Sequence, residues 1–448
     1  MTIAPSWAQR VTEGSADLYQ QRLVTAEEAV THVQSGNMVW VPVGQRVGLL
    51  LSALTARALD LENVEVKWLP SADFGWSSEI FEGHIRSNVL FGTPAVRGAL
   101  EDGQADYSPW WVFGGNKALE DQRPDAQAID VALICVTPPN KSGYVCLGTS
   151  LWDAQETARL ARTVIAAVNP TIPQTFGDTW LHVSEIDYFV ESNDPPPENR
   201  WGQVPPDPWD HTIAEYVTSL VNDRDTLQFG TGSTTGYIPA SGLLDQKRDL
   251  GYFAELTVFG TVELVQKGVI TSRYMTTHPG KFITTTAGNS AEDIEFINGN
   301  PMFEFYAPSY VHHPGSIGAN DNMVAINNAI TIDLTGQIGA GQIGRRTWSG
   351  TGGHLSYAMG AFLSKGGRYI CVLPSTAMSG TKSRIAPVLE EGQIVTVPRD
   401  LADIVVSEYG IAKLLGKSER QRAEELIAIA HPDFRGELRD EAQHRRWM

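Results

Sequence analysis

An internal repeat constrains the fold of this chain more than any other feature. A helix, an apolar strand, a Gly-containing turn, a second helix and a second strand are predicted over residues 26–67 and again over residues 214–255. Strands that alternate with helices are typical of βαβ units and parallel sheets. We therefore expect an α/β protein made of two related open α/β domains with mostly parallel sheets.

A proline-rich stretch separates the two copies of the repeat. Six prolines lie between Ser192 and Pro208, and this density excludes a helix or a central strand. A chain of 448 residues also exceeds what one ordinary core accommodates. We predict an N-terminal α/β domain over residues 1–193, a linker over 194–208 and a C-terminal α/β domain over 209–448.

Other segments fit the same alternation of strands and helices. Continuous apolar runs predict buried strands, and amphipathic runs that end at Gly or Pro predict helices. The predicted strands are residues 128–136, 164–168, 369–373 and 402–406, and the predicted helices are residues 153–162, 355–363 and 419–430.

Composition limits the classes of function. The chain has 52 acidic and 34 basic residues, so it lacks the basic surface of a sequence-independent nucleic-acid binder. No apolar run approaches the roughly 20 residues that cross a membrane, and no secretory leader is evident. We expect a cytoplasmic protein. The cysteines lie in apolar stretches without a CxxC pair, which predicts buried, reduced thiols at Cys135, Cys146 and Cys371.

Two glycine-rich turns could present bare backbone N–H groups to a ligand. Residues 229–236 follow a predicted strand, but they lack the ending of a P-loop and the spacing of a dinucleotide fingerprint. Residues 348–354 precede a predicted helix, where N–H groups suit an oxyanion or a phosphate. On the residues alone, a purely structural turn fits each of them as well.

Glu255 directly follows the apolar residues 252–254. A carboxylate in that position is either a surface strand end or a partly buried group that needs a compensating partner. The adjacent His312 and His313 have no metal-binding spacing around them, so we expect no metal site. His182 lies between apolar residues and is expected to be a structural histidine.

Longer stretches carry a family resemblance, and they occur in order along the chain. They are residues 136–148, 168–173, 181–187, 325–337, 349–353, 364–367, 373–376 and 406–410. With these motifs the chain resembles the acetyl-CoA hydrolase/transferase family, the class I CoA-transferases of the 4-hydroxybutyrate and butyrate CoA-transferase type.

The resemblance implies a CoA-transferase that moves CoA from an acyl-CoA to a small carboxylate. Glu255 matches the family's catalytic glutamate. It would form an acyl-glutamyl anhydride and then a glutamyl-CoA thioester, with ping-pong kinetics and with water kept out. Relatives of this type also imply a homodimer or a higher homo-oligomer.

The resemblance assigns further site residues. Thr231 and Gly353 match backbone positions that hold oxyanions, Asn320 would help to position the carboxylate, and Glu408 matches a second glutamate near the site. Coenzyme A is the one cofactor implied. It would be held by Leu227, Gln228, Phe229, Gly230, Thr231, Ser349, Gly352, Gly353 and Lys365.

The chain departs from its relatives next to the glutamate. Phe253 and Ala254 stand where relatives usually have His and then Ser or Thr, and the first glycine turn differs too. Acetate, butyrate and 4-hydroxybutyrate therefore stay open as substrates beside a dicarboxylate such as succinate or itaconate. An acyl-CoA hydrolase on the same scaffold is one alternative function. A non-catalytic CoA or sugar-phosphate sensor is another, and the intact Glu255 with both glycine turns argues against it.

Overall fold

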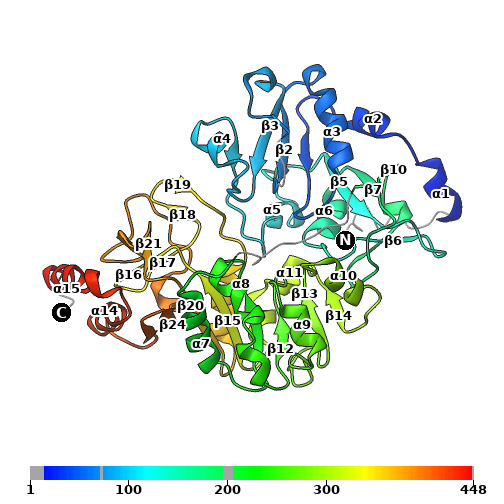
Figure 1. Ribbon diagram of the computed structural model, residues 1–448. Helices are drawn as coiled ribbons and strands as arrows, with labels where there is room; N and C mark the ends of the chain where they lie inside the picture. The colour runs from blue at the N-terminus through cyan, green and yellow to red at the C-terminus, as the bar shows by residue number, and fades with distance from the viewer. Residues whose placement is uncertain (1–14, 71–73, 195–204, 446–448) are drawn as a thin grey trace. The chain divides into compact units, whose positions relative to one another are not determined.

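The structure is a computed structural model that describes residues 15–70, 74–194 and 205–445 (Figure 1). The chain divides into two compact units, which are described separately. Unit 1 comprises Met1–Trp110, Gly114–Glu198 and Ile294–Pro308, and unit 2 comprises Trp111–Phe113, Asn199–Asp293 and Ser309–Met448. Most of the predicted linker, residues 195–204, lies outside the described residues.

Unit 1 is built on a parallel sheet of seven strands in the order β10-β7-β5-β1-β2-β3-β4. β5 is buried at every position, as a parallel strand covered on both faces should be. The bounds are β1 Met38–Trp40, β2 Val64–Trp68, β3 Ile85–Val89, β4 Asp106–Tyr107, β5 Val131–Val136, β7 Thr163–Val168 and β10 Tyr188–Glu191.

Helices and shorter pairs complete unit 1. The helix α3 buries Leu50, Leu51 and Leu54 in a core that also holds Val39 of β1 and Val66 of β2. The helices are α1 Ser15–Gln21, α2 Ala26–Ala29, α3 Gly48–Ala56, α4 Arg97–Glu101, α5 Lys117–Glu120 and α6 Ala154–Leu160. Two short pairs join β6 Tyr144–Cys146 to β9 Trp180–His182, and β8 Phe176–Gly177 to β14 Phe303–Phe305.

Unit 2 repeats this plan. Its strands run in the order β25-β24-β20-β15-β11-β12-β13, all parallel except the edge strand β25. The sequence of strands outward from β11 is the same as the sequence outward from β1, so the predicted pair of related α/β domains is confirmed. The bounds are β11 Thr226–Phe229, β12 Gly251–Phe253, β13 Phe282–Thr284, β15 Met323–Asn328, β20 Arg368–Val372, β24 Ile404–Ser407 and β25 Gly410–Lys413.

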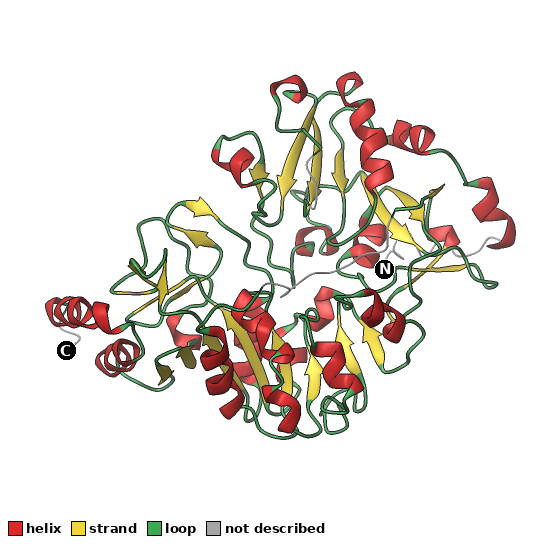
Figure 2. Ribbon diagram, in the orientation of Figure 1, coloured by secondary structure: helices red, strands yellow, loops and turns green. Residues whose placement is uncertain are grey.

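Helices flank the strands of unit 2 (Figure 2). They are α7 Asp210–Ser219, α8 Ser233–Ala240, α9 Thr261–Gln266, α11 Pro308–Val311, α12 Pro314–Gly318, α13 His354–Leu363, α14 Glu419–Ala428 and α15 Arg435–His444, and α10 Ala291–Ile297 spans the boundary between the units. Short strands follow β15, namely β16 Thr331–Asp333, β17 Ile338–Gly339, β18 Gln342–Ile343, β19 Arg346–Thr347, β21 Thr376–Ala377, β22 Lys382–Ser383 and β23 Ile385–Ala386.

The strand order of unit 2 creates a switch point between β11 and β15. From β11 the chain adds β12 and β13 on one side, and from β15 it adds β20 and β24 on the other. Right-handed crossovers then place α8 and α13 on opposite faces of the sheet. Ligands of open α/β sheets bind at such a point, beyond the carboxyl ends of the strands.

Several expectations about single residues are confirmed. All three cysteines are free and buried, and burial raises the pKa of Cys135 and of Cys371 to about 12, so these thiols stay protonated. His182 is buried with its Nδ1 2.8 Å from the hydroxyl of Ser184, which is a structural role. Among the described helices, none has the length and apolarity needed to cross a membrane.

Candidate active site

The first glycine turn lies at the switch point and packs closely against the end of β15. A Cβ atom on Gly230 would come within 2.6 Å of the side-chain oxygen of Asn327. A Cβ atom on Gly232 would overlap the side-chain amide of Asn328, whose oxygen also accepts the N–H of Thr235 at 3.0 Å. The two glycines are therefore required by this close approach.

Thr231 lies in this turn, directly before the N-terminus of α8. The side chain is exposed, and Gly232 is the N-cap residue of the helix. N–H groups in the first turn of a helix have no acceptor within the helix, and they carry partial positive charge. The turn can therefore offer donors to an anionic group.

The strand residues before the turn offer no comparable surface. Leu227 and Phe229 are fully buried in β11. Gln228 is buried as well, and its amide exchanges hydrogen bonds of 3.1 and 2.9 Å with the amide of Asn327. These three predicted CoA-binding residues are buried in the strand that precedes the turn, so they support the turn and expose no side chain to a ligand.

Glu255 follows β12 at the same edge of the sheet. Its backbone carbonyl accepts N–H groups from Thr285 at 3.1 Å and Thr286 at 3.2 Å, which fixes the residue against the end of β13. Its side chain is 15% exposed, and Oε2 accepts a hydrogen bond from Nε2 of His312 at 2.9 Å. The sequence predicted that a buried carboxylate here needs a compensating partner, and that partner is His312.

The second glycine turn reaches the same carboxylate. Gly353 is the N-cap residue of α13, with an ordinary φ of −87°. A Cβ atom there would nevertheless overlap both Oε2 of Glu255 and the ring of His312. Gly353 is required for space rather than for backbone conformation, and it places backbone directly beside the carboxylate.

Buried side chains hold this second turn in place. His354 is buried, and its Nε2 lies 2.5 Å from the hydroxyl of Tyr369 on β20. Burial lowers the pKa of His354 to about 4, so its ring is neutral at ordinary pH. Ser349 lies in the same turn and donates its N–H to the carbonyl of Gly341 at 3.0 Å.

Asn320 is not brought to this site, which corrects the expectation that it positions the carboxylate. Asn320 precedes β15, whereas Glu255 follows β12, and the parallel strands of one sheet put these positions at opposite edges. Its buried side chain is committed to local structure. The oxygen accepts from Thr277 N–H at 3.2 Å and Oγ1 at 2.7 Å, and the amide nitrogen donates to Ser316.

Lys365 is also far from the glycine turns. It is exposed in the turn between α13 and β20, whereas Gly353 lies at the other end of α13. A ten-residue helix is about 15 Å long. Lys365 therefore lies at the amino-terminal edge of the sheet, opposite Glu255.

Glu408 lies at the same edge as Glu255 but not beside it. It follows β24, and its carboxylate accepts from Ser375 N–H at 2.8 Å and Oγ at 2.5 Å. Three strands, β20, β15 and β11, separate β24 from β12. At the usual strand spacing, the two positions are roughly 19 Å apart across the sheet.

Sequence reasoning missed three neighbours of the site. Asn327 and Asn328 end β15 at the switch point and lie within one of the family-like stretches, so their position after an apolar strand was an available signal. His312 had no such signal, because it is 57 residues from Glu255 along the chain. No group of three or more His, Cys, Asp or Glu side chains suited to a metal ion occurs in the described part of the chain.

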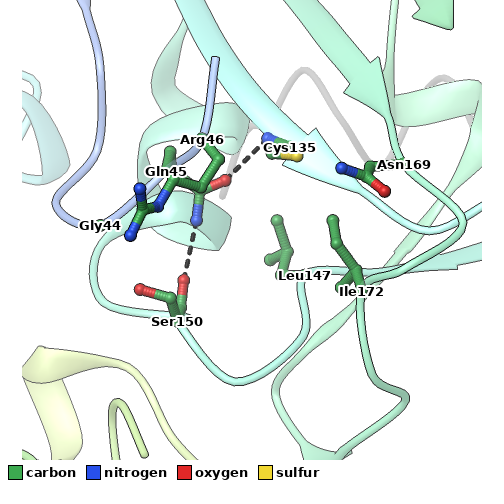
Figure 3. Close-up of a pocket in the computed structure, with 8 residues that line it drawn as sticks. All are labelled: Gly44, Gln45, Arg46, Cys135, Leu147, Ser150, Asn169 and Ile172. Carbon is green, nitrogen blue, oxygen red and sulfur yellow. Dashed lines mark hydrogen bonds between the residues drawn. The ribbon is translucent and has the colours of Figure 1, made fainter. Parts of the chain in front are cut away.

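The equivalent place in unit 1 is filled by a side chain (Figure 3). Gln45 follows β1, accepts the N–H of Cys135 at 2.7 Å and donates to the carbonyl of Ser150 at 2.7 Å. The remaining cavity, bordered also by Asn169 and Ile172, measures about 10 Å³, the size of one water. The turn of unit 1 has one glycine, Gly44, whereas the corresponding turn of unit 2 carries Gly230 and Gly232.

Comparison with known proteins places the chain in a family. The acetyl-CoA hydrolase/transferase N-terminal domain matches residues 8–197, and the C-terminal domain of the same family matches residues 290–442. The 4-hydroxybutyrate coenzyme A transferase of Clostridium kluyveri is 39% identical over 96% of this chain and 99% of its own length.

Two further proteins agree with this match. The succinyl-CoA:cyclohexane-1-carboxylate CoA transferase of Geobacter metallireducens is 36% identical over 95% of this chain and 96% of its own. The crystal structure of RipA from Yersinia pestis superposes with a TM-score of 0.88 at 31% identity, covering 97% of this chain and 100% of RipA. The expectation of an enzyme of the CoA-transferase class is confirmed. The chain belongs to the acetyl-CoA hydrolase/transferase family, as its motifs predicted.

Proposed function

We propose that the protein transfers CoA from an acyl-CoA to a small carboxylate and that Glu255 is the covalent nucleophile. One observation carries the proposal. A nearly buried carboxylate lies at the carboxyl edge of the sheet, against the bare backbone of Gly353 and one strand away from the glycine turn at the switch point. A nucleophile beside backbone donors is what acyl transfer through a carboxylate requires.

The reaction proceeds in two symmetrical halves. One oxygen of Glu255 attacks the thioester carbon, CoA thiolate leaves, and an acyl-glutamyl anhydride forms. The thiolate then attacks the glutamyl carbon, releases the donor's carboxylate and leaves a glutamyl-CoA thioester. The acceptor carboxylate reverses both steps and departs as the new acyl-CoA, which gives ping-pong kinetics.

The site residues take the following roles in this proposal. Backbone N–H groups around Thr231 and Gly353 stabilise the developing oxyanions. CoA lies along Gly230–Thr231 and Ser349–Gly353, with Leu227, Gln228 and Phe229 beneath the first turn. Asn320 and Lys365 are left out, and Glu408 has no direct contact with the reacting carboxylate. We also propose that the protein is a homo-oligomer and that it acts in the cytoplasm.

The two side chains before the nucleophile, Phe253 and Ala254, bear on the choice of acyl substrate. Phe253 and Ala254 are fully buried, and the ring of Phe253 packs edge-on against Tyr310 at 6.0 Å. They are packed in the core and present no polar group to a substrate. We propose a short acyl chain. Because relatives are named for 4-hydroxybutyrate and for succinyl-CoA, 4-hydroxybutyrate and succinate are the first carboxylates to assay.

Intact-protein mass spectrometry tests the mechanism. Incubation with acetyl-CoA alone should add one CoA to the protein, and Glu255→Ala should abolish the addition. Acetate, butyrate, 4-hydroxybutyrate, succinate and itaconate are then compared as acceptors. If no acyl-CoA gives an adduct, the covalent mechanism is wrong. If no carboxylate consumes the thioester faster than water does, the protein is a hydrolase instead.

A further inference from the structure

His312 is a buried histidine in direct contact with the reacting group. Its side chain is fully buried, and Nε2 lies 2.9 Å from Oε2 of Glu255. The backbone of Gly353 packs against the same ring. An oxygen at the Oε2 position therefore faces the imidazole.

The other ring nitrogen identifies the tautomer. Nδ1 of His312 is buried and has no hydrogen-bond partner among the described residues. A hydrogen on Nδ1 alone would leave a buried donor without an acceptor and would turn the bare lone pair of Nε2 toward a carboxylate oxygen, which can only accept. The hydrogen is therefore on Nε2, and Nε2–H donates to Oε2.

Neighbouring side chains fix the ring in this orientation. The ring of Tyr357 packs edge-on against His312 with centroids 5.5 Å apart. The hydroxyl of Tyr357 donates to the carbonyl of Val311 at 3.2 Å, so it anchors the residue that precedes the histidine. His312 cannot turn away from Glu255 without disturbing this buried packing.

The two oxygens of Glu255 have different fates, and only one faces His312. When Oε1 attacks the acyl carbon it becomes the bridging oxygen of the anhydride, and Oε2 becomes the glutamyl carbonyl oxygen. When CoA thiolate attacks the glutamyl carbon, negative charge develops on Oε2 until the bridging C–O bond breaks and the donor's carboxylate leaves. A donor aimed at that oxygen strengthens as the charge grows.

We propose that His312 is a catalytic oxyanion donor, which stabilises the tetrahedral intermediate at the glutamyl carbon through Nε2–H. The inference rests on the proposed function, because only a covalent glutamyl intermediate places an oxyanion at Oε2. It acts in both halves of the reaction, since each half includes an attack on the glutamyl carbon. It contributes more to the transition state than to substrate binding, so it raises kcat with little effect on KM.

A matched pair of substitutions tests the role of the N–H group. His312→Gln keeps an amide donor at the end of a long side chain. His312→Met has similar length, has no donor, and adapts to a buried site. The rate of CoA-adduct formation from acetyl-CoA, followed by rapid quench and intact mass, should fall by about 100-fold or more in His312→Met, and His312→Gln should recover much of that loss.

Two controls accompany the pair. His182→Met makes the same substitution at a buried structural histidine in unit 1, and it should retain the wild-type rate of adduct formation. Thermal melts establish that each variant is folded. Should His312→Met not fold, His312→Phe takes its place, because it keeps a ring against Tyr357.

The outcomes separate this inference from the proposed function. If the wild-type protein forms no adduct and transfers no CoA, the proposed function is wrong, and this inference falls with it. If the wild-type protein forms the adduct but folded His312→Met is as fast as His182→Met, the inference alone is overturned. Equal loss in folded His312→Gln and His312→Met also overturns it, because a donor would then make no difference.

Discussion

Glu255 is held on two sides at once, by His312 through Oε2 and by the backbone of Gly353. Such a site tolerates little change in the reach of the carboxylate. Glu255→Asp retracts the group by one methylene, away from both contacts. We expect transfer to fall by at least about 100-fold, because misplacement of a reacting group by an ångström costs that much. Steady-state transfer and thioester hydrolysis, measured side by side, check this, and unchanged transfer would contradict the positioning argument.

Gly353 gives a second prediction. Gly353→Ala puts a methyl group where Oε2 of Glu255 and the His312 ring now lie, so the nucleophile must shift. We expect kcat to fall by 10-fold or more while KM for the acyl-CoA changes less. Gly436→Ala is the matched control, since a Cβ atom there meets no neighbour within 4 Å. An equal effect on kcat and KM would count against a transition-state role for this turn.

How far these residues could be predicted depends on the kind of information involved. Glu255 and Gly353 lie in local patterns that the sequence displays, a strand end and a glycine turn. His312 meets Glu255 only through tertiary packing, and no local pattern records that contact. The motif around Asn320 matches the family, but a motif does not indicate at which end of β15 the residue lies. Strand direction, once known, excludes it.

The glycine turn after β11 packs directly against the end of β15, so substitutions in the two segments should affect stability together. Gly232→Ala would overlap the amide of Asn328, and the cost should be about 1–3 kcal/mol of unfolding free energy, as for overpacking elsewhere. Asn328→Gly removes the obstacle, including the Cβ atom that would lie 2.5 Å from the new methyl group, and it also removes the acceptor of the Thr235 N–H. We expect the double variant to lose less than the sum of the two single losses. Urea unfolding measures all three, and strict additivity would contradict the contact.

The buried contact between His354 at the start of α13 and Tyr369 of β20 predicts a pH dependence of stability. Burial lowers the pKa of His354 to about 4 from its usual 6.5, so the unfolded chain binds a proton that the folded protein does not between these values. The contribution is present above pH 6.5 and is lost as pH falls toward 4, by up to about 3 kcal/mol. His354→Gln should flatten the difference in unfolding free energy across this window, as urea titrations at several pH values would record. A wild-type slope in that variant would assign the effect to other groups.

Elements with a long apolar or amphipathic run could be predicted well from the sequence, and short elements could not. The expected strand over residues 369–373 is β20 at Arg368–Val372, and the expected helix over 419–430 is α14 at Glu419–Ala428. The two- and three-residue strands between β16 and β23 were not predicted, because so few residues show no periodic pattern of apolar side chains. Their pairing depends on backbone hydrogen bonds between distant segments.

Across the whole molecule, the repeat predicted the two related α/β domains, but the domain boundary is not a single point in the sequence. The sequence placed everything after residue 208 in the C-terminal domain, whereas residues 294–308 return to unit 1. The signal was absent because β14 is three residues long and its partner β8 two. Such short strands can be recognised only from their pairing in the folded structure.

The return of β14 determines where the chain can be cut. A fragment ending at residue 193 keeps β8 but loses the strand that pairs with it, which leaves an open edge that invites aggregation. We expect this fragment to be insoluble, and soluble yield should improve when residues 294–308 are joined to it by a flexible linker. Soluble yield and far-ultraviolet circular dichroism compare the two fragments, and a well-folded 1–193 would contradict the prediction. The proline-rich stretch that looks like the natural place to divide this enzyme is therefore a poor place to split it for expression.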